Sequence, residues 1–169
     1  MEARILYFTV HSASNLRDVR KIGKMKVYAK VTVAEKSEET EVDSVNKTNP
    51  VWNKTFSFNV PELSIIQGQG KISIKIELFC RRSFSHDKYV GEVNLSLDSQ
   101  CAKSCNITCV VDRKGTNYQN SGFGNLTYSS SDLTDKFINS NSSHKINAVE
   151  VGAALLSTVA TVGAAALAI

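Results

Sequence analysis

Apolar and polar residues alternate with a period of two along most of the first 111 residues. The segment 71–79, KISIKIELF, places its aliphatic residues on one side of an extended chain and its polar residues on the other. Such strands bury one face and leave the other in water, which is typical of antiparallel sheets packed face to face. We therefore expect an all-β fold, an eight-stranded antiparallel β-sandwich. The expected strands are 4–12, 26–34, 39–44, 52–60, 71–79, 89–97, 106–111 and 124–129.

Aromatic residues mark the expected core next to the second turn. Trp52 follows Asn49 and Pro50, and we expect it to anchor this turn against the sandwich. Phe56 and Phe58 alternate with polar residues, so both should be buried between the sheets.

The composition changes twice beyond the expected domain at 1–130. Residues 131–147 are rich in Ser and Asn, which predicts a flexible linker. The hydrophobic tail at 148–169 ends in nineteen residues without a charge. As a helix these residues would rise about 28 Å, close to the hydrocarbon thickness of a bilayer. We expect a C-terminal transmembrane helix, a tail anchor.

Two other interpretations of the tail stay open: a helix on a protein surface, or a cleavable lipid-anchor signal. The N-terminus has no apolar signal segment, which counts against the second of these. Because no signal segment is visible, we also expect the domain on the cytosolic face of a membrane, either the plasma membrane or the endoplasmic reticulum. Lys136, His144 and Lys145 lie on the domain side of the tail, as a cytosolic flank should.

The net charge of +4 is modest, and the basic stretch at 20–31, RKIGKMKVYAKV, raises the question of its partner. Nucleic acid is disfavoured, because only Tyr28 lies close enough to stack on bases. An enzyme is disfavoured too. The three histidines are scattered, without an adjacent nucleophile and acid, and no glycine-rich phosphate loop is present.

The four cysteines are Cys80, Cys101, Cys105 and Cys109. In a reducing cytosol we expect free thiols. The last three are evenly spaced, but this spacing matches no zinc pattern and no histidine pair lies nearby. We therefore expect no metal site and no cofactor.

Three blocks of sequence, in this order and spacing, resemble the C2 domain. They are LRDV at 16–19 with GKMKVYAKV at 23–31, TNPVWN at 48–53 with Phe56 and Phe58, and DKYVGE at 87–92. The resemblance covers residues 1 to about 130 and is nearest to the small plant C2 proteins of cold and defence responses, the cold-regulated and copine-associated groups. It implies an eight-stranded sandwich in the permuted, phospholipase-type topology, in which the first strand leads directly into the first binding loop.

Calcium-binding C2 domains carry five aspartates in loops at one end of the sandwich. By the resemblance, these positions fall at Arg20, Lys26, Cys80, Arg82 and Lys88. None is acidic, and Asp18 and Asp87 lie nearby but out of register. Calcium takes about six to eight oxygen ligands. A cationic side chain about 6 Å from a calcium ion repels it by about 5 kcal/mol at an effective dielectric constant near 20. The resemblance therefore implies a C2 domain without bound calcium.

The same loops should form a positively charged end that binds acidic lipid or a protein partner. The candidate residues are Arg20, Lys21, Lys24, Lys26, Arg81, Arg82 and Lys88. Each such charge near an anionic leaflet contributes about 1 kcal/mol. The alternative is that these are solvated loop residues, and for Lys30, on the outer face of a strand, that alternative is favoured. Ile22 and Met25 either insert at the interface or pack locally.

The function we expect is that of a calcium-independent, membrane-associated adaptor or regulator, in plant stress or defence signalling by resemblance. Its partners would be anionic membrane lipids, an unidentified protein or both, and not nucleic acid. The alternative is a calcium-dependent phospholipid-binding sensor with a degraded site, using Asp18, Asp87 and backbone carbonyls.

Overall fold

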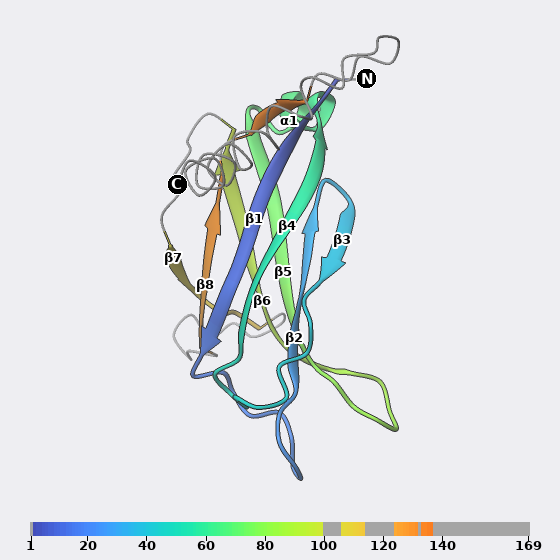
Figure 1. The fold of residues 1–169 in the computed structure, drawn as a ribbon, viewed down its shortest axis with the longest axis vertical. Helices are drawn as coiled ribbons and strands as arrows, with labels where there is room; N and C mark the ends of the chain where they lie inside the picture. The colour runs from blue at the N-terminus through green and yellow to red at the C-terminus, as the bar shows by residue number, and fades with distance from the viewer. Residues whose placement is uncertain (1, 100–105, 114–123, 132, 137–169) are drawn as a thin grey trace, which may run out of the picture. The chain divides into compact units, whose positions relative to one another are not determined.

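Two antiparallel sheets pack face to face in the computed structural model, which describes residues 2–99, 106–113, 124–131 and 133–136 (Figure 1). The elements are β1 (Ala3–Ser14), β2 (Val27–Val33), β3 (Lys36–Glu39), β4 (Val51–Pro61), α1 (Glu62–Gln67), β5 (Lys71–Cys80), β6 (Lys88–Asp98), β7 (Ile107–Val110), β8 (Asn125–Ser130) and β9 (Thr134–Lys136). One sheet has the order β4-β1-β8-β7, with β9 also paired to β1, and the other has the order β3-β2-β5-β6. The all-β prediction is confirmed.

The core lies between the sheets and is built by the alternation seen in the sequence. On β5, the four aliphatic residues from Ile72 to Leu78 are all buried. On β4, Phe56 and Phe58 are buried as predicted, with ring centroids 5.9 Å apart. From β1, Phe8 stacks on Tyr128 of β8 at 5.3 Å. Each strand thus gives one face to a common apolar layer.

The strand order places the end of β1 at the first loop. β1 pairs with β4 on one side and β8 on the other, and leads directly into residues 15–26. β8, the last long strand in the chain, therefore lies beside the first strand in the sheet. The permuted topology predicts this arrangement.

The prediction of a strand at 39–44 is wrong in its position. β3 spans Lys36–Glu39, because Ala34 and Glu35 form a two-residue turn with φ of 47° and 67°. Positive φ at both central residues matches the twist of the flanking strands. The chain beyond β3 still follows β2, through a hydrogen bond from the Thr40 N–H to the Ala29 carbonyl and a bridge between Val27 and Asp43.

Two short elements are absent from the sequence-based prediction. α1 has six residues, too few to produce a recognisable helical period. β9 pairs with β1 inside the segment 131–147 that is predicted to be a linker, and Leu133 packs against the core.

The rest of the linker and the whole tail lie outside the described residues. Within the part of the chain that the structure describes, no helix has the length and apolar character needed to cross a bilayer.

Three connections meet at one end of the sandwich (Figure 1). We call them loop 1 (15–26), loop 2 (40–50) and loop 3 (81–87); they join β1 to β2, β3 to β4, and β5 to β6. Trp52 anchors the base of loop 2, because its indole Nε1–H donates to the Val27 carbonyl at 3.0 Å and its ring packs against the core. This confirms the role predicted for Trp52.

Replacing Phe58 with Ala should lower the free energy of unfolding by about 3–5 kcal/mol, because a buried aromatic leaves a cavity between the sheets. Urea denaturation measures this loss. The neighbouring Ser57 is exposed on the outer face, so Ser57→Ala is the matched control and should stay within about 0.5 kcal/mol of wild type. Equal effects of the two substitutions would contradict the assignment of the β4 faces.

Candidate functional site

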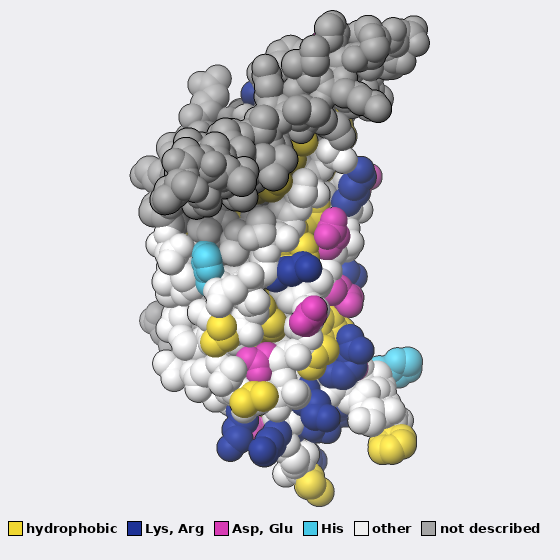
Figure 2. All heavy atoms as spheres, in the orientation of Figure 1, with side chains coloured by type: hydrophobic (Ala, Val, Ile, Leu, Met, Phe, Trp, Pro, Cys, Tyr) yellow, Lys and Arg dark blue, Asp and Glu magenta, His cyan; other side chains and the backbone are white. Residues whose placement is uncertain are grey.

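Cationic side chains concentrate at the loop end of the sandwich. Figure 2 shows Lys and Arg gathered at the lower end of the molecule, where loops 1 to 3 lie, with hydrophobic side chains at two loop tips. The exposed hydrophobic residues of loops 1 and 3 are Ile22 and Phe84, with relative exposures of 88% and 104%. The loop end therefore combines positive charge with exposed apolar tips.

A groove of about 570 Å³ separates loop 1 from loop 3. Its lining residues are Arg20, Lys21, Ile22, Arg82, Ser83, Phe84, Ser85 and Lys88. Four of these are cationic and none is acidic. The groove thus brings together four of the seven predicted binding residues.

Lys88 ties loop 1 to the start of β6. Its ammonium Nζ donates to the Val19 carbonyl oxygen at 2.7 Å, across 69 positions of sequence. A second hydrogen bond connects loops 1 and 3: the Arg81 backbone N–H donates to the Lys26 carbonyl at 2.7 Å. At a position where the resemblance implies a calcium ligand, the protein's own cation binds a loop carbonyl.

Arg20 is held in place by its own loop. Its backbone N–H donates to the Asp18 carboxylate at 2.8 Å, and its guanidinium donates to the Lys24 carbonyl. The turn between them contains Gly23 with φ of +85°, a conformation that favours glycine. The side chain of Arg20 therefore closes the turn at the tip of loop 1.

The carboxylate of Asp87 stabilises the conformation of loop 3. It accepts the Arg82 backbone N–H at 3.0 Å and the Tyr28 hydroxyl at 2.8 Å, and it pairs with the Arg81 guanidinium at 3.3 Å. The Arg82 hydrogen bond leads the causes that lower the pKa of Asp87. Burial, followed by Asp87, raises the pKa of Tyr28 to about 12, so its hydroxyl stays a donor.

Arg81 differs from the other predicted binding residues. Its guanidinium lies 4.9 Å from the centre of the Tyr28 ring and is paired with Asp87. Its charge is therefore largely compensated. Tyr28, expected on the wet face of its strand, is buried because Arg81 and Phe79 cover it.

Lys21, Lys24 and Lys26 are the most available cations of loop 1. All three side chains are exposed, and they make no hydrogen bond or ion pair within the described part of the chain. Lys21 lines the groove, whereas Lys24 and Lys26 lie outside it.

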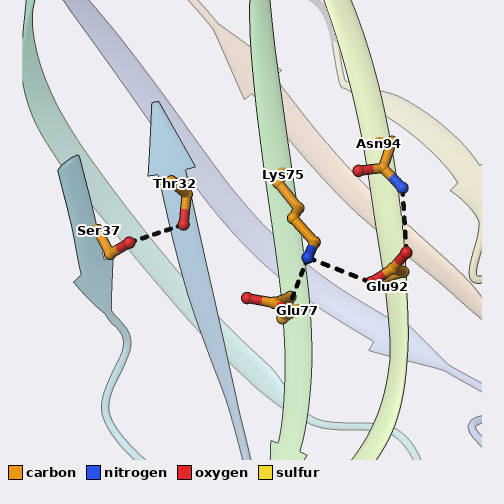
Figure 3. Close-up of polar contacts among 6 residues, drawn as sticks. All are labelled: Thr32, Ser37, Lys75, Glu77, Glu92 and Asn94. Atoms are coloured by element: carbon orange, nitrogen blue, oxygen red, sulfur yellow. Dashed lines mark hydrogen bonds and ion pairs between the residues drawn. The ribbon is translucent and has the colours of Figure 1, made fainter. Parts of the chain in front are cut away.

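The charges on the outer face of the four-stranded sheet offer a contrast. Lys75 pairs with Glu77 at 2.9 Å and with Glu92 at 3.5 Å, and Asn94 donates to Glu92 (Figure 3). Acidic partners thus offset the positive charge there. The loop end carries positive charge that such pairs do not offset.

The structure distinguishes the two alternatives left open for Met25 and Ile22, and it also places Cys80. Cys80 is fully buried and faces the core, so its thiol does not reach the groove. Met25 packs locally, with a relative exposure of 1%, whereas Ile22 is exposed. Cys101 and Cys105 lie outside the described residues. Among the residues that the structure does describe, no group of three or more His, Cys, Asp and Glu side chains could hold a metal ion.

Sequence reasoning missed Phe84 and Asp43. Phe84 is a lone aromatic among polar residues, and its only signal is its place in a short polar loop. Asp43 organises loop 2: its carboxylate accepts the backbone N–H groups of Val45, Asn46 and Val51 at 2.8–2.9 Å. Burial acts to raise the pKa of Asp43, but the hydrogen bonds outweigh it and lower the pKa to about 2.

The chain is similar to several known proteins. The family model described as the C2 domain matches residues 4–112. "Protein SRC2 homolog" of Arabidopsis thaliana is 33% identical over 98 residues, covering 56% of this chain and 30% of that protein. "Protein SRC2" of Glycine max is 29% identical over 102 residues, covering 57% and 34%. The chain thus matches about a third of the length of these relatives.

Two solved structures share the fold. A C2 domain of plant Extended Synaptotagmin 1 has a TM-score of 0.64 at 17% identity, covering 80% of this chain and 98% of that one. Human GIVD cytosolic phospholipase A2 has a TM-score of 0.60 at 16% identity, covering 80% and 17%. At such identities the likeness concerns the fold alone.

Replacing Asp43 with Asn should make loop 2 less stable in a pH-dependent way. Because the folded pKa of about 2 lies below the ordinary value of 3.8, the charged carboxylate stabilises the fold above about pH 4, and this stability is lost as the pH falls toward 2. We expect Asp43→Asn to cost about 1 kcal/mol at neutral pH. Urea midpoints over this range should show the difference shrinking; a constant difference would contradict the assignment.

Proposed function

Because the chain belongs to the C2 domain family, we propose that it is a membrane-association module that works without calcium. In this proposal, the cations of loops 1 and 3 bind anionic phospholipid directly. The observation that carries the proposal is the hydrogen bond from the Lys88 ammonium to the Val19 carbonyl at 2.7 Å.

Oxygen atoms at the loop end are already engaged by protein donors. The Val19 carbonyl accepts a hydrogen bond from the Lys88 ammonium, and the Lys24 carbonyl accepts one from the Arg20 guanidinium. Asp87 has three donors of its own. Calcium needs about six to eight oxygens, mostly carboxylates, so binding it would require breaking these contacts beside several positive charges. This supports a loop end that is positive whether or not calcium is present.

The exposed lysines of loop 1 supply attraction to acidic lipid. Each lysine contributes about 1 kcal/mol to the binding free energy near an anionic leaflet. This contribution decreases as the salt concentration rises, because salt screens the charges. Such binding is weak for a free domain, and a second attachment would strengthen it through effective concentration. The hydrophobic tail at 148–169, whose last nineteen residues carry no charge, is the natural second attachment.

The biological setting in the proposal comes from similarity. The matched relatives are plant proteins, and the sequence resembles the C2 proteins of stress and defence responses. We therefore assign an adaptor or regulator role in such signalling, with an anionic membrane and a protein as partners. A calcium-dependent sensor is the second candidate, favoured by the presence of Asp18 in loop 1, and the experiment below separates the two.

The chain truncated after Asn147, which lacks the hydrophobic tail, should sediment equally with phosphatidylserine vesicles in calcium and in chelator. The charge term is tested by Lys21→Glu with Lys24→Glu, which should weaken binding by about thirtyfold or more, because two charges are reversed. Both side chains lack partners in the described structure, so the fold should be kept.

The matched control is Lys36→Glu with Lys71→Glu. These lysines are exposed and lie at the ends of β3 and β5 away from loops 1 to 3. The two control substitutions change the net charge by as much as the two loop substitutions do. If net charge alone governed binding, both pairs would weaken it equally. Binding that appears only with calcium would overturn the proposal in favour of the sensor.

Removing residues 148–169 should turn a carbonate-resistant membrane protein into one that salt or carbonate extracts. The reason is that about twenty apolar residues supply the bilayer insertion that surface charges cannot. Fractionation of cells that express the two lengths measures this. A full-length chain that is already extracted by carbonate would rule out the anchor.

A further inference from the structure

We propose that the groove between loops 1 and 3 is a binding site for a phosphomonoester, held by side chains without a metal ion. The ligand class includes the headgroups of phosphatidate and of phosphorylated inositol lipids. The inference rests on the proposed function and deepens it, because it distinguishes headgroup recognition from general attraction to negative surfaces.

The first support is uncompensated charge. The groove is lined by Arg20, Lys21, Arg82 and Lys88, and no acidic residue lines it. The two nearby carboxylates are used elsewhere: Asp18 accepts the Arg20 backbone N–H, and Asp87 pairs with Arg81. Within the described residues, no carboxylate pairs with the charged groups that line the groove. A polyanion would supply the missing countercharge.

The second support is that two of these cations are already fixed. Lys88 uses one of its three N–H donors on Val19, and the Arg20 guanidinium uses part of its five on Lys24. Both keep donors for a ligand. Because backbone carbonyls hold them, binding need not order these two long side chains, which removes part of the usual entropic cost. General surface attraction requires no such arrangement.

The third support is the match in charge and polarity. A phosphodiester carries one negative charge, whereas a phosphomonoester carries about −1.5 to −2 near neutral pH and offers three acceptor oxygens. Two fixed cations in the lining of one groove match the second better. Ser83 and Ser85 add hydroxyl groups for a hydroxylated headgroup. The apolar rim, Ile22 and Phe84, favours a lipid over a free phosphate ester.

The test compares full-length protein on two kinds of vesicle in the presence of chelator. Both contain phosphatidylcholine, with either phosphatidate or phosphatidylserine, matched in zeta potential. We expect about tenfold tighter binding to phosphatidate, the factor given by one further charge-assisted hydrogen bond. The tail is the same in both cases and cancels from the ratio. Equal binding overturns this inference and leaves the proposed function standing, whereas binding to neither overturns both.

Two pairs of substitutions separate the groove from the rest of the loop end. Arg20→Gln with Lys88→Met removes two charges from the groove, and Lys24→Gln with Lys26→Gln removes two beside it. The first pair should abolish the preference for phosphatidate, and the second should weaken binding to both lipids while keeping the ratio. A preference that survives the first pair overturns the inference. Near-ultraviolet circular dichroism checks folding, and Arg20→Gln alone serves if the pair does not fold.

A soluble competitor distinguishes the source of the phosphate. Glycerol phosphate should displace the protein from phosphatidate vesicles, and sulfate at equal ionic strength should not. Displacement by both alike would reduce the effect to screening and overturn the inference. If glycerol phosphate alone binds as tightly as the vesicle, the site recognises a soluble phosphomonoester, and the lipid source is excluded.

Discussion

Burial of one face of every long strand against the opposite sheet is the constraint on which this structure depends. Phe8, Phe56 and Phe58 meet the aliphatic rows of β2 and β5, and no strand can slip by one residue without moving its apolar set into water. With the register fixed, the places where strands end are fixed too. Loops 1, 2 and 3 therefore leave the sandwich at one end, far apart in sequence and adjacent in space. The candidate functional surface results from the packing of the core.

The loop end uses its charges in two distinct ways. Arg20, Arg81 and Lys88 are bound to carbonyls, a carboxylate or an aromatic ring, and they hold the loops in shape. Lys21, Lys24 and Lys26 are exposed and contribute mainly to the surrounding field. Counting positive residues would treat these groups alike. The difference between them is what allows a surface to have both a long-range attraction and a local site.

Alternation predicted the sheets because it reports burial directly, strand by strand. It failed at β3, whose four residues KSEE are all exposed, and whose turn at Ala34 and Glu35 lacks the usual Gly or Asn. The loop positions and their charges were also visible in the sequence. The pairing of Arg81 with Asp87, the Lys88 contact and the exposure of Phe84 were not, because each depends on side-chain directions set by the folded loops. No periodic pattern encodes them.

In the proposed function, the Lys88–Val19 contact also determines what kind of signal the loop end follows. A metal ion enters and leaves as its concentration changes, so a domain built around one reports that concentration. An ammonium group is covalently part of the chain and cannot leave it. A surface that works as proposed does not respond to a transient of free ions. In the proposed function the variable is the membrane, and the domain responds to changes in lipid composition or to covalent neutralisation of its amines.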